Sequence, residues 1–195
     1  TKWNATPLRV ARVSFSGDLS FEVSIRRSKV QDLWHALRGA GATPSGLEAM
    51  AVMRAEKGFI MIGKDTDGQT MPHDLGFGLP RAKKTSAFVG ARSLHSAVAN
   101  DTARKQLVGL SVDASQSKLP VGAHVVNAPA HPRSLGYVTS SYVSPSLGHP
   151  IALALVDAGA SLMGETVTVW HLGETRRALI TSAVFFDPQG ERIHA

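Results

Sequence analysis

The sequence of 195 residues contains no cysteine, which excludes disulfide bonds, thiolate nucleophiles and cysteine-based metal sites. Its longest strongly apolar run, residues 151–156, is far shorter than the roughly 20 residues that a membrane-spanning helix needs. Neither end carries a signal-peptide pattern, and there is no internal repeat. With 43% hydrophobic and 18% charged residues, the chain is expected to form a globular protein with a buried core, located in the cytoplasm.

Most motifs that carry chemistry are also absent. There is no Walker phosphate loop, no G-x-S-x-G nucleophile elbow and no H-E-x-x-H metal motif. The eight histidines are scattered without the spacing of metal ligands, so we expect structural or surface roles for them. The residues alone therefore indicate no nucleophile and no metal centre.

The net charge of +6 and the pI of about 10.0 raise the question of a nucleic-acid partner. The basic residues are dispersed, however, in pairs such as Arg26-Arg27 and Arg176-Arg177, whereas nucleic-acid patches are denser. A solvated surface, or the steering of a small anionic ligand, explains the charge better. We expect neither a nucleic acid nor a membrane as a partner.

The stretch "FSGDLSFEV", residues 15–23, is typical of a β-hairpin. Small turn residues separate two segments in which apolar and polar side chains alternate, as in half-buried antiparallel strands. Before the turn, Arg12 takes the polar parity and Ala11 the apolar one, and after the turn Glu22 is polar between two apolar neighbours. Glu22 is therefore expected to face away from the hydrophobic layer, toward water or toward a ligand.

Two amphipathic helices are predicted after the hairpin. The first begins after Ser28, a suitable N-cap, and ends near Gly39. The second begins with Ser45 and Glu48, spaced as a capping box, and ends at Gly58.

Arg54 takes a position on the second helix that the pattern would give to an apolar residue. In one interpretation its guanidinium extends past the apolar face or pairs with the last carbonyls of the helix, where a cation is favoured by roughly 0.3–1 kcal/mol. In the other, Arg54 and Glu22 face one cleft, where a carboxylate and a planar set of donors recognise a heterocycle rich in donors and acceptors. The residues alone leave both interpretations open.

The rest of the chain predicts one more buried strand and then a β-rich half. "GFIMIG", residues 58–63, is an apolar run bounded by glycines, which is typical of a buried strand. "KDTDGQ" after it lacks the third acidic position before the glycine and the distal glutamate of a calcium loop, so it is expected to be a surface turn. Short strand-like runs at fairly even spacing then predict an antiparallel barrel or sandwich. These runs are residues 107–112, 123–126, 136–143, 151–156, 166–170 and 178–186.

Several stretches together resemble the aminomethyltransferase (glycine-cleavage T-protein) family. "SFSGDLSFEV" is similar to that family's hairpin, usually close to S/G-Y-T-G-E-x-G-F/Y-E, and "MRAEKG" is similar to its R-x-E-x-G helix end. "LVGL", "GYVTSSYVSPSLGHPIALALV" and "GETVTVW" follow in the order of the family's C-terminal barrel. Within the family, "RAEKGFIMIGKDTDGQTMPHDLG" and "TSAVFFDPQGERIHA" most resemble the C-terminal, folate-binding part of the α subunit of heterotetrameric sarcosine oxidase.

The resemblance implies a site for tetrahydrofolate. In relatives the glutamate that ends the hairpin motif binds the pterin ring, and it corresponds to Glu22; the aromatic residue that lines the pocket corresponds to Phe15, and the helix-end arginine to Arg54. Asp18 replaces the usual glutamate and Ser20 the usual glycine, which affects the geometry of the hairpin more than the ligand class. The aspartate that relatives use in one-carbon transfer lies upstream of the hairpin, so no catalytic residue is assigned in this chain.

The predicted fold class is α+β, the remnant of a T-protein-like folate-binding α/β domain followed by a C-terminal antiparallel β-barrel. The expected division is 1–84 for the last portion of the folate-binding domain, 85–104 for a linker and 105–195 for the barrel. Because the chain lacks an initiator methionine and enters a strand at once, we expect it to be part of a longer protein.

By the same resemblance, the expected function is to bind tetrahydrofolate within a sarcosine oxidase α subunit. The complex would oxidise sarcosine with flavin and NAD as cofactors held elsewhere, and would transfer the one-carbon unit to tetrahydrofolate. Its partners would be the other subunits and the preceding part of the α subunit, and the isolated fragment is expected to be inactive. The alternatives are a glycine-cleavage T-protein or dimethylglycine-type aminomethyltransferase, a non-catalytic folate-binding or RNA-modification accessory protein, and a fragment that serves only as an interaction surface.

Overall fold

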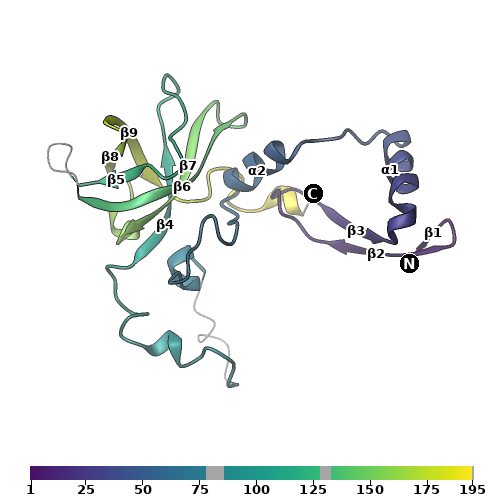
Figure 1. Ribbon diagram of the computed structural model, residues 1–195, viewed down its shortest axis with the longest axis horizontal. Helices are drawn as coiled ribbons and strands as arrows, with labels where there is room; N and C mark the ends of the chain where they lie inside the picture. The colour runs from purple at the N-terminus through teal and green to yellow at the C-terminus, as the bar shows by residue number, and fades with distance from the viewer. Residues whose placement is uncertain (78–85, 128–132, 195) are drawn as a thin grey trace.

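The computed structural model describes residues 1–77, 86–127 and 133–194. It has an N-terminal part of strands and helices beside a closed six-stranded antiparallel barrel (Figure 1). The predicted α+β class with a barrel in its second half is thereby confirmed. Residues 78–85, where the first part and the linker were expected to meet, lie outside the described residues, so the division into 1–84, 85–104 and 105–195 stays a prediction.

The N-terminal part contains a three-stranded antiparallel sheet and two helices. In chain order its elements are β1 (Lys2–Trp3), β2 (Thr6–Arg12), β3 (Phe21–Ile25), the 3-10 helix η1 (Arg27–Lys29), α1 (Val30–Gly39) and α2 (Leu47–Glu56).

Both predicted helices are confirmed, but their predicted caps are wrong. Ser28 lies inside η1, and Lys29 takes the N-cap position of α1. Gly46, one residue after Ser45, takes the N-cap position of α2. Neither cap makes a side-chain hydrogen bond, so these helices depend on packing and on the turns before them.

Residues 58–63 do not form the predicted buried strand. Gly58 has a φ of +72°, and Phe59 N–H bonds to the carbonyl of Arg54 at 2.8 Å, so the chain leaves α2 through a tight turn. Ile62 is 82% exposed. Ile60 instead packs on Leu107, Leu153 and Leu155. The apolar run therefore packs against the outside of the barrel through Ile60. The chain then continues to the short helix η2 (Pro72–Leu75).

The barrel closes in the order β4-β7-β6-β5-β8-β9, with β9 pairing back to β4. Each predicted strand-like run of the second half overlaps one of these strands, with shifted ends, but the run 178–186 overlaps β9 only up to residue 181. The barrel strands are β4 (Lys105–Ser111), β5 (His124–Val126), β6 (Ser134–Ser144), β7 (His149–Asp157), β8 (Thr166–His171) and β9 (Glu174–Thr181). Short 3-10 helices lie before, between and after them: η4 (Ser93–His95), η5 (Gly159–Leu162) and η6 (Glu191–Ile193).

Alternation along the strands separates the inside of the barrel from its outside. Val108 and Leu110 of β4 join the main core cluster with Ala152, Ala154 and Val156 of β7, and this cluster fills the barrel. Leu107, Leu153 and Leu155 have the opposite parity and form a second cluster on the outer surface.

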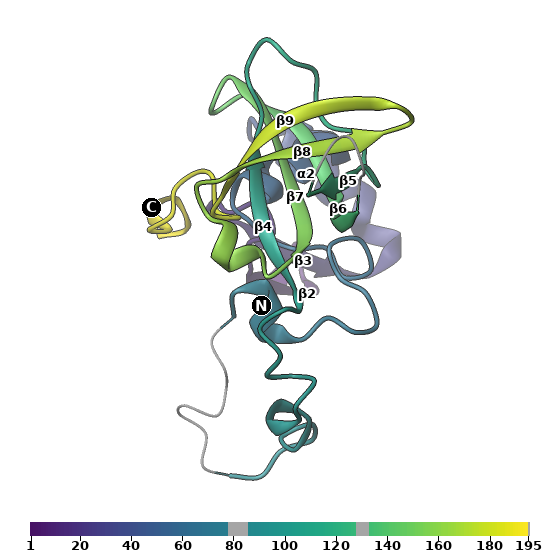
Figure 2. The ribbon, with the colours of Figure 1, turned by 90° about the vertical axis from the view of Figure 1, so that its left-hand side faces the viewer.

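The helix α2 lies against the outer surface of the barrel at β6 and β7. In Figure 2 the barrel faces the viewer, and the N-terminal helices and hairpin lie behind it. Among the described residues, none of the helices combines the length and the apolar character needed to cross a membrane.

Candidate functional site

The hairpin that carries Glu22 has a different register from the one its sequence suggests. Glu22 pairs directly with Ala11, while Arg12 pairs with Phe21. Cross-strand partners share a face of the sheet, so Glu22 lies on the face of Ala11 and not on that of Arg12. The prediction assumed a short turn, whereas the connection runs from residue 13 to residue 20 and shifts the pairing.

The connection between β2 and β3 is held by small polar side chains. Gly17 N–H donates to Ser14 Oγ at 2.9 Å, and Ser20 Oγ donates to the carbonyl of Asp18 at 3.0 Å. Ser16 Oγ lies 3.2 Å from Ser20 Oγ. Ser20, which departs from the family's usual glycine, therefore helps to close this turn.

Arg54 is completely buried, with its guanidinium between α2 and the barrel. It forms an ion pair with Asp65. It also donates to Ser140 Oγ at 2.6 Å, to the carbonyl of Phe59 at 3.1 Å and to Tyr142 Oη at 3.3 Å. One helix residue thus binds the loop after α2 and strand β6 together.

Asp65 is the centre of this buried network. Thr139 and Ser140 donate hydroxyl hydrogen bonds to Asp65 Oδ1 at 2.6 Å each, and Met61 N–H donates to Oδ2 at 2.9 Å. Burial alone would raise the pKa of Asp65, but these hydrogen bonds and the charge of Arg54 together lower it below its ordinary value. Asp65 is therefore a buried carboxylate rather than part of the predicted surface turn.

The expectation that Arg54 and Glu22 face one cleft is wrong. Glu22 is exposed on β3, whereas the Arg54 guanidinium is enclosed with Asp65. The physical reason is the way α2 docks. Its buried residues are Arg54, Ala55 and Glu56, at its last turn, so this turn contacts the barrel and encloses the Arg54 side chain.

Glu56, which the sequence analysis did not single out, is the second polar residue after Arg54 through which α2 contacts the barrel. Its carboxylate accepts hydrogen bonds from the hydroxyl of Ser144 and, at 3.0 Å, from Ser146 Oγ. The signal was present in the sequence, because Arg54 and Glu56 are the arginine and glutamate of the R-x-E-x-G motif. Both side chains of the motif thus bind the barrel in this structure.

Tyr142 lies at the outer end of the same network. Its hydroxyl accepts hydrogen bonds from Lys64 Nζ at 3.0 Å and from Arg54 Nη2 at 3.3 Å, and both cations lie over its ring. Burial raises the pKa of Tyr142, but hydrogen bonds from Lys64 and Arg54 and their charges outweigh it and lower the pKa below 10.0.

A cavity of about 750 Å³ lies where the hairpin, the loop after α2 and the barrel meet. Phe15 lines it, and Glu22 does not. The lining is mainly apolar and includes the aromatic rings of Phe15, Phe59 and Phe77. Apolar lining residues include Phe15, Phe59, Ile60, Leu75, Phe77, Leu107, Met163 and Val184. A cavity of this size and character suits a flat aromatic group.

The charged side chains of this cavity already have partners. Lys57 pairs with Asp187 at 2.8 Å, and Asp74 pairs with Arg104 at 2.6 Å. Within the part of the chain that the structure describes, no group of three or more histidine, aspartate or glutamate residues could hold a metal ion. The charged groups of the cavity wall are therefore engaged with one another or with neighbouring residues.

The comparisons with known proteins match this architecture. Residues 1–84 match the family model of the GCVT N-terminal domain, and residues 105–187 match that of the glycine cleavage T-protein C-terminal barrel domain. The chain belongs to the glycine cleavage T-protein family. The resemblance of its motifs to this family is thereby confirmed.

Curated relatives from two groups of this family align over nearly the whole chain. The sarcosine oxidase subunit alpha of Corynebacterium sp. (strain P-1) is 38% identical over 193 residues, which are 94% of this chain and 20% of that protein. The corresponding subunit of Rhizobium meliloti (strain 1021) is 38% identical over 192 residues, with 94% and 19% covered. The aminomethyltransferase of Synechococcus sp. (strain RCC307) is 32% identical over 185 residues, with 94% and 50% covered.

The chain therefore spans about a fifth of the sarcosine oxidase subunits and half of the aminomethyltransferase. Among solved structures, the glycine cleavage system aminomethyltransferase T from Bartonella henselae superposes with a TM-score of 0.79. The two are 22% identical, and the match covers 93% of this chain and 50% of that one. This likeness shows that the T-protein family fold is present.

Proposed function

We propose that this chain is the tetrahydrofolate-binding, C-terminal part of a sarcosine oxidase α subunit. The intact complex would oxidise sarcosine and transfer the one-carbon unit to tetrahydrofolate, and a cytoplasmic location stays part of this prediction. The identity of 38% to sarcosine oxidase alpha subunits supports the assignment. Flavin and NAD would belong to other parts of the complex, and the other subunits and the preceding part of the α subunit would be the partners.

The observation that carries the folate proposal is the state of Glu22. Its carboxylate is exposed on β3. Among the described residues it has neither a hydrogen bond nor an ion pair, and it stands where the family motif has its pterin-binding glutamate. A free carboxylate can accept two hydrogen bonds from the amino and ring N–H groups of a pterin.

In this proposal Phe15 would contact the folate directly, whereas Arg54 would not. Phe15 would pack against an aromatic part of the folate, because its ring lines the large cavity. Arg54 would act indirectly, by holding the loop after α2 through Asp65. No residue of this chain is proposed as catalytic, and the chemistry of the one-carbon group would be carried out upstream of the hairpin.

Glu22→Ala and Glu22→Gln in the intact complex test the proposal. Because hydrogen bonds to a charged group contribute about 1.5–3 kcal/mol, we expect the affinity for 5-formyltetrahydrofolate to fall by at least about tenfold. The rate of flavin-dependent sarcosine oxidation should remain largely in place. Calorimetric titration and a steady-state oxidation assay measure the two quantities.

Glu48→Ala is the matched control, because Glu48 is an exposed glutamate in the first turn of α2. It should leave folate affinity unchanged. An equal loss of folate binding and sarcosine oxidation in the Glu22 variants would show that Glu22 maintains the fold and would refute its role as a ligand.

The second candidate is a T-protein or dimethylglycine-type aminomethyltransferase, favoured by the relative that is 32% identical over 185 residues. The same hairpin would bind folate in either protein. The assay that separates them is sarcosine oxidation by the intact protein with its genomic neighbours, because a glycine-cleavage enzyme would show none.

A further inference from the structure

The segment that follows the barrel, residues 182–193, returns to the N-terminal part of the molecule; we call it the strap. It leaves β9 at Thr181, passes the end of α2 and ends beside the β2–β3 connection (Figure 1). The strap therefore joins three elements that are far apart in the sequence.

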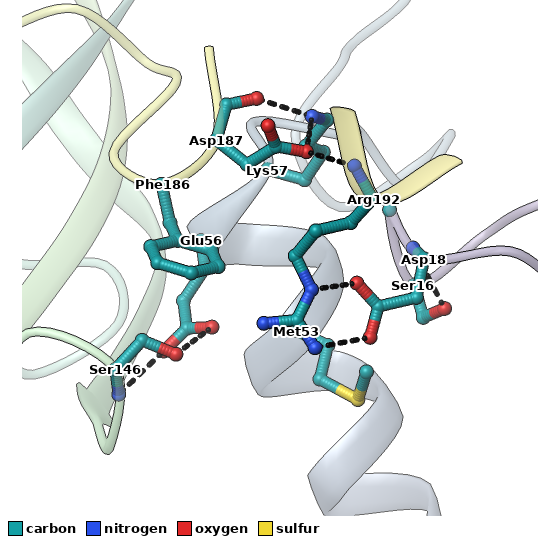
Figure 3. A pocket seen from close by; sticks show the side chains of 10 residues that line it. Ser16, Asp18, Met53, Glu56, Lys57, Ser146, Phe186, Asp187 and Arg192 are labelled. Atoms are coloured by element: carbon teal, nitrogen blue, oxygen red, sulfur yellow. Dashed lines mark hydrogen bonds and ion pairs between the residues drawn. The ribbon is translucent and has the colours of Figure 1, made fainter. Parts of the chain in front are cut away.

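The strap binds the hairpin through Arg192 and its neighbour. Figure 3 shows the Arg192 guanidinium against the carboxylate of Asp18, with Nε 2.7 Å from Oδ1 and Nη2 3.1 Å from Oδ2. Leu19 N–H donates to the carbonyl of Arg192 at 2.9 Å, and Arg12 Nη2 donates to that of Ile193 at 2.9 Å. Two parallel contacts to one carboxylate fix both the distance and the orientation of the strap relative to the hairpin turn.

The strap is itself attached to the end of α2. Lys57 Nζ lies 2.8 Å from Asp187 Oδ2, and both side chains are 9% exposed. Phe185 N–H and Phe186 N–H both donate to the carbonyl of Glu56 at 2.9 Å. The hydrogen bond from Lys57 and its positive charge lower the pKa of Asp187, although partial desolvation of the carboxylate acts in the opposite direction. Since α2 is docked on the barrel, the strap is anchored to the rigid part of the fold.

The hairpin turn packs tightly on this anchor. Gly17 has a φ of +91°, and a Cβ placed there would lie 2.7 Å from Lys57 Cγ. The space left between the turn, α2 and the strap is about 70 Å³. On the strands themselves Val10, Phe21 and Val23 are exposed, so the strands bury little apolar surface, and the hairpin is positioned at its turn by the close approach to Lys57 and by the polar contacts to the strap.

We propose that Arg192 is a positioning residue of the folate site. It holds the turn between Phe15 and Glu22, so that the pterin-binding carboxylate and the ring in the cavity keep one relative orientation, while Asp187 fixes the strap to the end of α2. This inference rests on the proposed function, and it adds a residue far from the hairpin in sequence to the determinants of folate affinity.

The test uses the intact complex and the affinity for 5-formyltetrahydrofolate. Arg192→Gln should weaken binding by about fivefold, the range expected for losing an ordered but partly exposed ion pair. Arg192→Lys, which keeps the charge, should restore part of the loss. The exchanged pair Asp18→Arg with Arg192→Asp should restore more than either single change alone.

The matched control is Lys105→Gln, which breaks the exposed Lys105–Asp157 pair of 3.0 Å on the barrel. It should change neither folate affinity nor amide exchange. In Arg192→Gln, amide hydrogen exchange should rise in residues 15–22 and stay unchanged in the barrel strands.

Unaltered folate affinity in Arg192→Gln, or unaltered exchange in the hairpin, would overturn the positioning role. Failure of the exchanged pair to recover affinity would also overturn it. If the unmodified complex bound no folate, the proposed function would fail first, while the exchange measurement would still report whether the strap holds the hairpin.

Discussion

Arg54 shows how one residue can have a conspicuous position in a sequence and a role that only its contacts reveal. A guanidinium on an apolar helix stripe is expected to reach solvent or a ligand, yet here it is fully buried with Asp65 and Ser140. Burial of a charge requires a partner and further hydrogen bonds. The partner came from a loop that sequence reasoning placed on the surface.

Replacing Asp65 by asparagine should strongly destabilise the chain. The change leaves the Arg54 charge buried without its counter-ion, which typically costs about 3–5 kcal/mol. Urea unfolding of the two proteins measures the difference. Asp157→Asn is the control, because its ion pair with Lys105 is exposed and should contribute no more than about 1 kcal/mol.

The same pair predicts a pH dependence. The pKa of Asp65 is lowered in the folded state, so its contribution is present above the unfolded value of about 3.9 and is lost as the pH falls through the folded value. The difference between Asp65→Asn and the unmodified protein should therefore shrink below about pH 4. A difference that stayed constant down to pH 2 would contradict an ionised Asp65.

The two tyrosines of the chain provide a separate measurement. Burial and the charge of Asp67 raise the pKa of Tyr137, whereas Lys64 and Arg54 outweigh burial and lower that of Tyr142. We expect phenolate absorbance to appear in two steps on either side of pH 10.0. Tyr142→Phe should remove the lower step, and a single step near the ordinary value would contradict the contacts of Tyr142.

Among the elements, α2 makes its buried contacts at its last turn and not along one whole face. Leu47 is 80% exposed although the helical pattern marks it as apolar. The last turn instead carries the buried contacts, through Arg54 to β6 and through Glu56 to Ser144. The turn that follows, with Gly58, decides where the chain goes next, and it replaces the strand that the apolar run predicts.

Gly58→Ala should therefore be more harmful than the same change at Gly63. Both glycines have positive φ values, of +72° and +82°. A Cβ on Gly58 would lie 2.6 Å from the carbonyl oxygen of Ala183, whereas nothing lies within 4 Å of one on Gly63. We expect Gly63→Ala to cost about 1 kcal/mol in free energy of unfolding and Gly58→Ala clearly more. Thermal or urea unfolding of both variants measures the two losses in free energy of unfolding. Equal losses would contradict a role for the close contact between Gly58 and Ala183 of the strap.

Across the whole molecule, the barrel has a closed core while the N-terminal part leaves apolar side chains uncovered. Exposed large apolar side chains of the hairpin and α1 include Val10, Val13, Phe21, Val23, Val30, Trp34 and Leu37. The described chain spans about half of the aminomethyltransferase relatives. Within it, the strap and the docking of α2 are what connect the hairpin to the barrel. Under the proposed function, the net charge of +6 would favour the approach of the anionic tail of folate.

Local pattern was sufficient for the elements of the barrel, both helices and the hairpin, because alternation and helical spacing depend on neighbours in the chain. The motifs with Glu22 and Arg54 were likewise sufficient to indicate the family. The register that places Glu22 opposite Ala11, the burial of Arg54 with Asp65, and the contact of Arg192 with Asp18 were decided only by the tertiary structure. Each of these joins residues through a long turn or across the fold, where the identity of the partner is set by packing and desolvation and not by spacing in the chain.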